Sequence, residues 1–320
     1  MKPPRLVAIA VLAGVATPAL ARRRWMANPD PTGGAPLDLP PGREVAVPTR
    51  DGGRLAAWVM GPDDGPVVVC AHGWTAERRI WAAPARRLVA AGRRVVVYDQ
   101  RGHGASTAGD DGLTIAAIGA DVATVLEHLD LRDAVVAGHS MGGMAVQSFA
   151  IEHKDVLGER VRALALVSTA GAEMGLKALD KSAASLIGSD STTKAVADAR
   201  FGPFLVRSTF GRRPAMAALR ATTESFARTP PATRRGFLDA IGTMNLHPHL
   251  GAVTATTAVV SGTRDTLVPH ARSRRTGELI AGARFIPIKG AGHQLPFESP
   301  DRLAAVLIDL GPTDPSREVR

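Results

Sequence analysis

A serine framed by two glycines most constrains what this chain can fold into. Residues 138–142 read Gly-His-Ser-Met-Gly, after the apolar run 134–137 and before a segment rich in small and helix-forming residues. This places Ser140 on a sharp turn between a buried strand and a helix, an arrangement typical of a nucleophilic serine. A side chain at Gly138 or Gly142 would collide with the neighbouring strand or helix. Because the chain has 33 glycines, an incidental serine in a glycine-rich turn is the alternative interpretation.

An acid and a histidine follow two later strands of the chain. The run 257–265 begins as a buried strand and ends in Asp265, and the next expected strand, 283–288, shortly precedes His293. Both side chains therefore lie just beyond the carboxyl end of a strand, where open α/β sheets place functional residues. A serine hydroxyl needs a histidine to take its proton and an acid to orient that histidine. The chain order Ser140, Asp265, His293 is the one expected for a nucleophile on this turn.

Strands and helices alternate through most of the sequence, after a predicted antiparallel hairpin at 44–47 and 55–60. The next expected strands are 67–71, 94–99, 134–138 and 162–168, and the expected helices are 77–91, 114–129 and 141–153. This alternation predicts a mostly parallel central sheet with helices on both faces. Between about 171 and 250 the pattern instead indicates several helices, among them 216–226 and 232–246, inserted between the sixth and seventh strands.

Five stretches in this order resemble the α/β-hydrolase superfamily of serine hydrolases, and in particular its serine esterases and lipases. They are 71–74, 98–106, 138–143, 262–269 and 290–293, and the resemblance covers about residues 43 to 311. It implies the α/β-hydrolase fold with a helical cap inserted over the active site. It also implies a catalytic triad in which Ser140 is the nucleophile, Asp265 the acid and His293 the base. The motifs are much more specific for the fold than for a substrate.

Two backbone N–H groups are expected to stabilise the negative oxygen of a tetrahedral intermediate. One belongs to Met141, which follows the predicted nucleophile and begins the next helix, where the helix dipole also favours an anion. The resemblance assigns the other to Trp74, the residue after His72 and Gly73. We interpret the His72 side chain itself as structural.

Several other polar side chains are interpreted as structural. Those in the glycine-rich connector after the strand 94–99, and beside the predicted nucleophile, are Asp99, Arg101, His103 and His139. The pair His247 and His249 lacks further ligands at the spacing of a metal site and is interpreted as a hinge where the chain re-enters the core. No glycine-rich phosphate loop, dinucleotide fingerprint or zinc pattern occurs in the sequence, so we expect no metal and no cofactor.

The predicted cap contains apolar side chains that either line a substrate pocket or pack within the cap. They are Phe201, Phe204, Leu205, Phe210, Phe226, Phe237 and Met244. For any single one of them, packing within the cap is the favoured interpretation. Taken together they favour a small-molecule ester with an apolar portion: a short- or medium-chain or lipid-like acyl group, or an aromatic ester.

The chain carries a formal net charge of +9, mostly from arginine. Nucleic acids and anionic membranes attract such charge. The arginines occur as scattered pairs, such as 93–94 and 274–275, and they are not interleaved with aromatic residues. We therefore expect a solvated basic surface and no nucleic acid partner. Oligomeric state does not follow from the sequence.

The N-terminal segment has the pattern of a signal peptide or a membrane anchor. Lys2 and Arg5 precede an apolar run from 6 to 20, and residues 19–21 fit a small-x-small cleavage site. Three arginines, 22–24, follow directly and favour an uncleaved anchor. The sequence therefore predicts a membrane-associated or exported protein. The predicted segments are the signal or anchor at 1–24, a linker at 25–42, a first core part at 43–170, the cap at 171–250, a second core part at 251–312 and a flexible tail at 313–320.

The predicted reaction is hydrolysis of a carboxylic ester through an acyl-enzyme on Ser140. Epoxide hydrolases and haloalkane dehalogenases of the same fold are disfavoured, because their nucleophile is an aspartate. Perhydrolase or haloperoxidase-like activity, hydrolysis of a thioester, lactone or carbon–carbon bond, and acyl transfer are alternatives on the same triad. A ligand-binding protein with little turnover and a protein that binds anionic membrane surfaces are alternatives of a different class.

Overall fold

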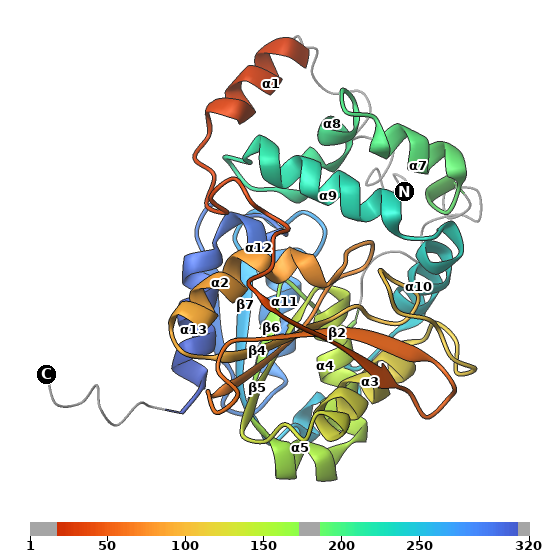
Figure 1. Ribbon diagram of the computed structural model, residues 1–320, viewed down its shortest axis with the longest axis vertical. Coiled ribbons are helices and arrows are strands. Elements are labelled where there is room, and N and C mark those ends of the chain that lie inside the picture. The colour runs from red at the N-terminus through yellow and green to blue at the C-terminus, as the bar shows by residue number, and fades with distance from the viewer. Residues whose placement is uncertain (1–17, 173–185, 313–320) are drawn as a thin grey trace, which may run out of the picture.

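The computed structural model describes residues 18–172 and 186–312 and is built around one eight-stranded sheet. The strand order is β1-β2-β4-β3-β5-β6-β7-β8. The strands are β1 Gly42–Pro48, β2 Arg54–Met60, β3 Val67–Ala71, β4 Arg94–Tyr98, β5 Ala134–His139, β6 Val161–Val167, β7 Thr256–Gly262 and β8 Arg284–Ile288. β2 pairs antiparallel with β1 and β4, and all other pairings are parallel. The predicted α/β-hydrolase fold, with its mostly parallel sheet, is confirmed (Figure 1).

The central strands are buried on both faces because apolar residues fill both of their alternating positions. In β3, Val68 and Cys70 belong to one core cluster, whereas Val69 and Ala71 belong to the other. Consecutive apolar residues of this kind are typical of a parallel sheet that is covered on both sides. The two clusters are therefore the two layers of core between the sheet and its helices.

Helices cover each face of the sheet (Figure 1). On one side, α2 (Ala82–Ala90) and α13 (Pro300–Leu310) pack against each other and share a core cluster. On the other side, α3 (Ile115–His128) and α4 (Met141–Glu152) do the same. The shorter helices of this part are η2 Arg78–Trp81, α5 Lys154–Arg160, α11 His270–Glu278 and α12 Leu295–Glu298.

A helical insertion separates β6 from β7, as the sequence predicts. Its described helices are α7 Asp190–Ala197, α8 Gly202–Val206, η4 Arg207–Thr209, α9 Met216–Arg228, α10 Pro231–Thr243 and η5 His247–Ala252. Figure 1 shows α7, α8 and α9 gathered in a layer of their own above the sheet. The two ends of the insertion meet, because the Leu246 N–H donates to Gly171 O at 2.7 Å. Part of the predicted cap, residues 173–185, lies outside the described residues.

The structure corrects the prediction that the chain is membrane-associated or exported through its N-terminal segment. Within residues 18–172 and 186–312, no helix has the length and apolar composition needed to cross a bilayer. The first described helix, α1 (Pro18–Ala27), has ten residues. Such a helix is about 15 Å long, whereas the hydrocarbon core is about 30 Å thick. α1 also carries three arginines, 22–24, and most of the apolar run before it lies outside the described residues.

The segment 25–42 lies against the protein, although the sequence predicts a flexible linker there. The Trp25 side chain is buried, and its ring centroid lies 4.7 Å from that of Phe204 in α8. The Arg86 guanidinium in α2 donates to Thr32 O at 2.6 Å. These contacts depend on residues far apart in the sequence, so the composition of the segment does not reveal them.

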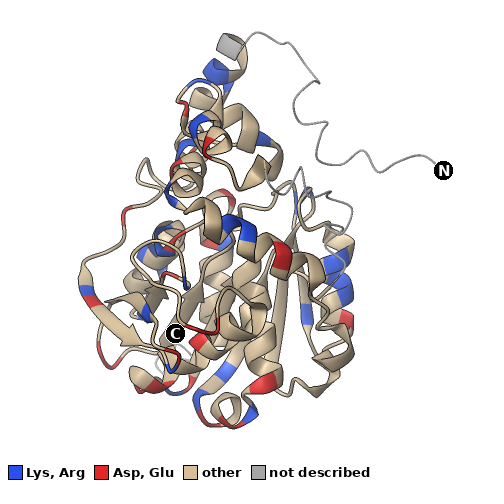
Figure 2. Ribbon diagram, turned by 90° about the vertical axis from the view of Figure 1, so that its right-hand side faces the viewer, with Lys and Arg blue, Asp and Glu red and all other residues tan. Residues whose placement is uncertain are grey.

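Basic and acidic residues are interspersed along the helices and loops in Figure 2. Several arginines pair with neighbouring carboxylates, such as Arg132 with Glu159 at 2.7 Å and Arg162 with Asp133 at 2.8 Å. Exposed pairs of this kind contribute little to stability.

Candidate active site

The serine turn, residues 138–142, joins β5 to α4 and holds Ser140 in a strained conformation. Ser140 has φ 54° and ψ −117°, which non-glycine residues rarely adopt. A Cβ at Gly138 would overlap Gly142 O, and a Cβ at Gly142 would lie 2.6 Å from His72 O. Both positions therefore require glycine, for the steric reason that the sequence suggests. The turn lies at the carboxyl end of β5 and leaves Ser140 partly exposed.

The loop after β3 lies directly against the serine turn. A Cβ at Gly73 would lie 3.1 Å from the Ser140 Cβ, so a larger residue there would crowd the serine turn. The loop continues into Trp74, one of the two predicted N–H donors. The other, Met141, is the first residue of α4, where N–H groups have no partner within the helix and the dipole favours an anion.

Asp265 and His293 form a buried hydrogen-bonded pair. Asp265 Oδ2 lies 2.8 Å from His293 Nδ1. The other carboxylate oxygen, Oδ1, accepts N–H groups of Leu267 at 2.9 Å and Val268 at 2.8 Å, which fix its orientation. An ionised Asp265 keeps the proton on Nδ1 of the neutral imidazole, so that Nε2 is the nitrogen able to accept a proton.

His139 fastens the His293 loop beside the serine turn. Its Nε2 lies 2.9 Å from His293 O, and the two ring centroids are 4.9 Å apart. His139 directly precedes Ser140, so the structure brings the predicted base next to the predicted nucleophile. Within the described residues the Ser140 hydroxyl makes no hydrogen bond. Catalytic hydrogen bonds are often long without substrate and shorten when it binds.

Three histidines around the serine turn are buried and neutral. His72 Nε2 accepts the Gln100 N–H at 2.9 Å, so its Nδ1 carries the proton and donates to Gly73 O at 2.8 Å. Burial lowers the pKa of His72 to about 4. Burial likewise lowers the pKa of His103 and of His139 to about 3. These side chains support the loops around the site and do not carry charge at neutral pH.

The buried histidines predict a loss of stability in mild acid. The unfolded chain, in which a histidine pKa is about 6.5, binds more protons than the folded protein below that pH. The free energy of unfolding is therefore greatest above about pH 7 and falls as the pH drops from about 6.5 toward 3, by roughly 2 kcal/mol per histidine at pH 5. Urea unfolding at pH 7.5 and pH 5 measures this loss. In a His103→Asn variant, the free energy of unfolding should differ less between the two pH values. An undiminished difference would refute the conclusion that His103 is buried in its neutral form.

Asp99 and Arg101 hold the connector after β4. The Arg101 guanidinium donates to Asp121 at 2.7 Å and to Asp51 at 2.8 Å, with all three side chains almost fully buried. Asp99 accepts the N–H groups of Arg78 and Ala105. These contacts hold the backbone of the connector in place, which agrees with the structural role that the sequence analysis gives to Asp99 and Arg101.

The described residues contain no group of three or more His, Cys, Asp or Glu side chains that could hold a metal ion. The segment that contains His247 and His249 forms the 3₁₀ helix η5, which follows the hydrogen bond between Leu246 and Gly171. The two histidines thus lie where the insertion returns to the core, as the hinge interpretation expects.

Most of the apolar side chains singled out in the predicted cap serve packing. Phe204 packs on Trp25, and Phe237 is fully buried with its ring centroid 5.5 Å from that of His103. The Arg234 guanidinium lies over the Phe226 ring at 4.7 Å. Phe201 is exposed at the surface. These contacts favour the packing interpretation over a pocket lined by these rings.

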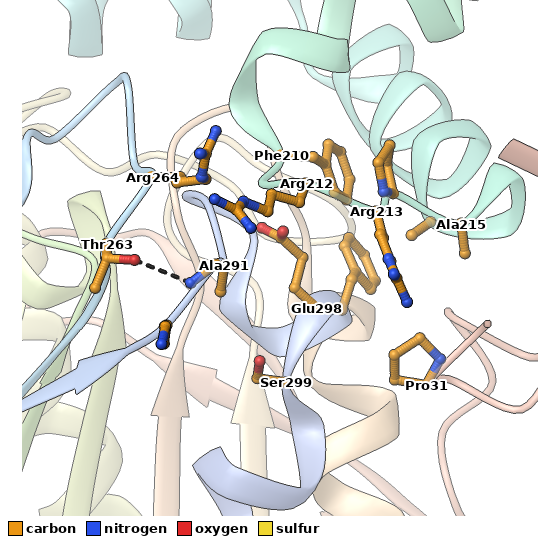
Figure 3. A pocket seen from close by; sticks show the side chains of 15 residues that line it. Pro31, Phe210, Arg212, Arg213, Ala215, Thr263, Arg264, Ala291, Glu298 and Ser299 are labelled. Atoms are coloured by element: carbon orange, nitrogen blue, oxygen red, sulfur yellow. Dashed lines mark hydrogen bonds between the residues drawn. The ribbon is translucent and has the colours of Figure 1, made fainter. Parts of the chain in front are cut away.

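A cavity of about 730 Å³ lies behind the loops that carry Asp265 and His293 (Figure 3). Its basic lining residues are Arg212, Arg213, Arg264 and Lys289, and its apolar wall includes Phe210 and Phe297. Ser140 does not line it, so we do not place the reacting group of a substrate there.

Two residues support the site without any signal in the local sequence. The Thr169 hydroxyl donates to Ser140 O at 2.7 Å and so holds the serine turn from β6. The Glu298 carboxylate accepts backbone N–H groups around His293. The Thr169 contact joins the loops after β6 and β5, so only the assembled sheet brings it about, whereas the Glu298 contacts are made within the segment that follows β8.

Comparison with known proteins places the chain in a family that has the fold described above. A family described as "alpha/beta hydrolase fold" matches residues 66–300, which span most of the chain and contain Ser140, Asp265 and His293. The chain belongs to the alpha/beta hydrolase fold family. This α/β hydrolase therefore has the family membership that the sequence motifs predict.

Individual relatives of the hydrolase differ in their named activities. It is 28% identical over 275 residues to the non-heme chloroperoxidase CPO-A1 of Kitasatospora aureofaciens, covering 79% of this chain and 94% of that protein. It is 41% identical over 97 residues to the bifunctional esterase/perhydrolase DCH of Acinetobacter calcoaceticus, covering 30% of this chain and 35% of that one. Among solved structures, the esterase RhEst1 from Rhodococcus sp. ECU1013 gives a TM-score of 0.72 at 23% identity, covering 84% of this chain and 99% of that one.

Proposed function

We propose that this hydrolase cleaves carboxylic esters of small molecules through an acyl-enzyme on Ser140. The observation that carries the proposal is the buried pair of Asp265 and His293, joined at 2.8 Å and held by His139 next to a strained serine turn. A serine, a histidine and an acid in this arrangement activate a hydroxyl for acyl transfer. The proposal needs no metal and no cofactor.

The proposed reaction has two halves. Ser140 Oγ attacks the ester carbonyl carbon while His293 Nε2 takes the hydroxyl proton, and Asp265 stabilises the imidazolium that forms. The tetrahedral intermediate collapses, the C–O bond to the alcohol breaks, and His293 returns the proton to the departing alkoxide. A water molecule then attacks the acyl-enzyme in the same way, with His293 again as the base, and releases the carboxylic acid.

The negative oxygen of each tetrahedral intermediate is assigned to the N–H groups of Met141 and Trp74. Both lie on segments that adjoin Ser140: the first turn of α4 and the loop whose Gly73 approaches the Ser140 Cβ. A donor of this kind contributes roughly 3 kcal/mol to the stability of the transition state.

The helical insertion is proposed to act as the cap of this site. The bridging segment, residues 208–211, bonds to both catalytic loops: the His293 N–H donates to Thr209 O at 2.8 Å, and the Thr266 hydroxyl donates to Ser208 O at 2.6 Å. A cap that is anchored to these loops would define the acyl pocket. We propose an apolar acyl group of short or medium length.

Perhydrolysis is a second candidate function, favoured by the similarity to an esterase/perhydrolase and to a non-heme chloroperoxidase. In this reaction hydrogen peroxide replaces water in the second half and attacks the acyl-enzyme. The C–O bond to Ser140 breaks, and a peracid leaves instead of the carboxylic acid. The same three side chains would serve both reactions.

Turnover of p-nitrophenyl esters of graded acyl length by the full chain tests the proposed function. We expect release of p-nitrophenol with an optimum at a short or medium chain, and loss of this activity in a Ser140→Ala variant. Addition of hydrogen peroxide, with detection of peracid, separates the two candidate reactions. A folded wild-type protein that hydrolyses none of these esters would contradict the proposal.

A further inference from the structure

The three backbone N–H groups at and beside His293, and the His293 carbonyl, are all hydrogen-bonded. The His293 N–H donates to Thr209 O at 2.8 Å, and its carbonyl accepts from His139 Nε2 at 2.9 Å. The two flanking N–H groups, of Gly292 and Gln294, both donate to Glu298. The distances are 3.0 and 3.1 Å from Gly292 N to the two carboxylate oxygens, and 3.1 Å from Gln294 N to Oε1.

The same carboxylate also binds the bridging segment of the insertion. Glu298 Oε2 accepts the Gly211 N–H at 2.7 Å. The two segments approach so closely that a Cβ at Gly292 would lie 2.5 Å from Gly211 N. Glu298 therefore holds together three backbone positions: the residues before and after His293, and the residue at which the insertion crosses the loop.

Only an ionised carboxylate fits this set of donors. Its two oxygens accept three N–H groups in four contacts, and it offers no proton that would face a donor. The pKa of Glu298 is raised overall, because burial and the nearby Asp265 carboxylate raise it more than the N–H groups of Gly211, Gly292 and Gln294 lower it. Figure 3 shows Glu298 at the edge of the cavity that Arg212 and Arg264 also line.

We propose that Glu298 is a positioning residue for His293. By fixing the N–H groups on both sides of the histidine, it sets the direction of the imidazole that Asp265 orients, and it couples this loop to the insertion. The inference rests on the proposed function, because it assigns His293 the role of base. Glu298 does not touch the reacting atoms.

Replacing Glu298 by glutamine is the direct test, since the amide has nearly the same shape but one of its two ends can only donate. In the place of Oε1 this end would leave the Gln294 N–H without an acceptor, and in the place of Oε2 it would do the same to the Gly211 N–H and remove one of the two Gly292 contacts. Loss of a partner that orients a catalytic group commonly lowers activity by about 10- to 100-fold. We expect this loss in kcat for p-nitrophenyl acetate, with KM changed by less than about three-fold, because Glu298 does not touch the ester and the acetyl group is too small to depend on the cap.

A matched control and a second readout separate positioning from general stability. Glu278→Gln removes the charge of an exposed carboxylate on α11, whose one ion pair among the described residues is with Arg275 at 3.6 Å, and it should leave kcat unchanged. Hydrogen exchange of the peptide 289–296 should become faster in Glu298→Gln and stay slow in the control. Should Glu298→Gln fail to fold, Glu298→Asp keeps the charge but shortens the side chain, and it should lose kcat and exchange protection together.

The outcomes distinguish this inference from the proposed function. Unchanged exchange at 289–296, or faster exchange with an unchanged kcat, would overturn the positioning role. A fall in total activity that only reflects a smaller amount of folded protein, with an unchanged kcat per folded molecule, would also overturn it. A wild-type chain that hydrolyses no ester would contradict the proposed function. If Glu298→Gln still speeds exchange of the Gly292 and Gln294 amides in that case, the structural part of the inference, that Glu298 fixes the His293 loop, stands on its own.

Discussion

Replacement of Ser140 by alanine is expected to lower the kcat for ester hydrolysis by about 10⁶-fold, the loss found when the nucleophile of a serine triad is removed. The variant has no oxygen to form the acyl-enzyme, so His293 and Asp265 are left without a group to activate. A residual rate above that in water should persist, because the N–H groups of Met141 and Trp74 remain. Steady-state kinetics with a p-nitrophenyl ester measures the effect.

A control for this variant is Ser273→Ala. The Ser273 side chain is fully buried in α11, and its hydroxyl has no hydrogen-bond partner within the described residues. Its removal should leave the turnover unchanged, so a loss that is specific to Ser140 reports on chemistry. If Ser140→Ala keeps turnover within about ten-fold of the wild type, the nucleophile has been misassigned.

Replacement of Asp265 by asparagine is expected to lower kcat by about 10⁴-fold. The amide oxygen should take the place of Oδ1, which accepts the Leu267 and Val268 N–H groups. The amide NH₂ then faces His293 Nδ1 and donates to it. That hydrogen bond moves the imidazole proton to Nε2, where it prevents the histidine from accepting the serine proton.

The loss in Asp265→Asn should appear in kcat with little change in the urea unfolding midpoint, since the two backbone hydrogen bonds are kept. Asp301→Asn is the control, because this exposed carboxylate on α13 pairs only with Arg87, at the surface. A loss of less than about ten-fold in Asp265→Asn would show that the Asp265–His293 pair is structural.

Features that depend on local sterics could be predicted from the sequence. The glycines of the serine turn follow from the space around Ser140, and the consecutive apolar residues of β3 identify a strand that is buried on both faces. Asp265 and His293 were identifiable because each follows a strand, and parallel strands end at one edge of a sheet. The structure joins these two side chains at 2.8 Å.

Features that depend on distant partners could not be predicted. Trp25 is buried by Phe204, a residue of the insertion, so the composition of 25–42 suggested a free linker. Phe237 packs on His103, and this contact explains why its ring belongs to the core. Glu298 lies in a short apolar helix, and its contact with the insertion depends on the Gly211 N–H group that the fold brings to it.

The most direct test of the central claim is covalent labelling with a fluorophosphonate, followed by mass spectrometry of the peptides. In this reaction the activated serine oxygen bonds to phosphorus and fluoride leaves, and His293 takes the serine proton. We predict one adduct per chain, on Ser140, with loss of ester turnover in proportion to labelling, and little reaction in Ser140→Ala or Asp265→Asn. An adduct on another residue, or full turnover by the completely labelled protein, would contradict the assignment of Ser140 as the nucleophile.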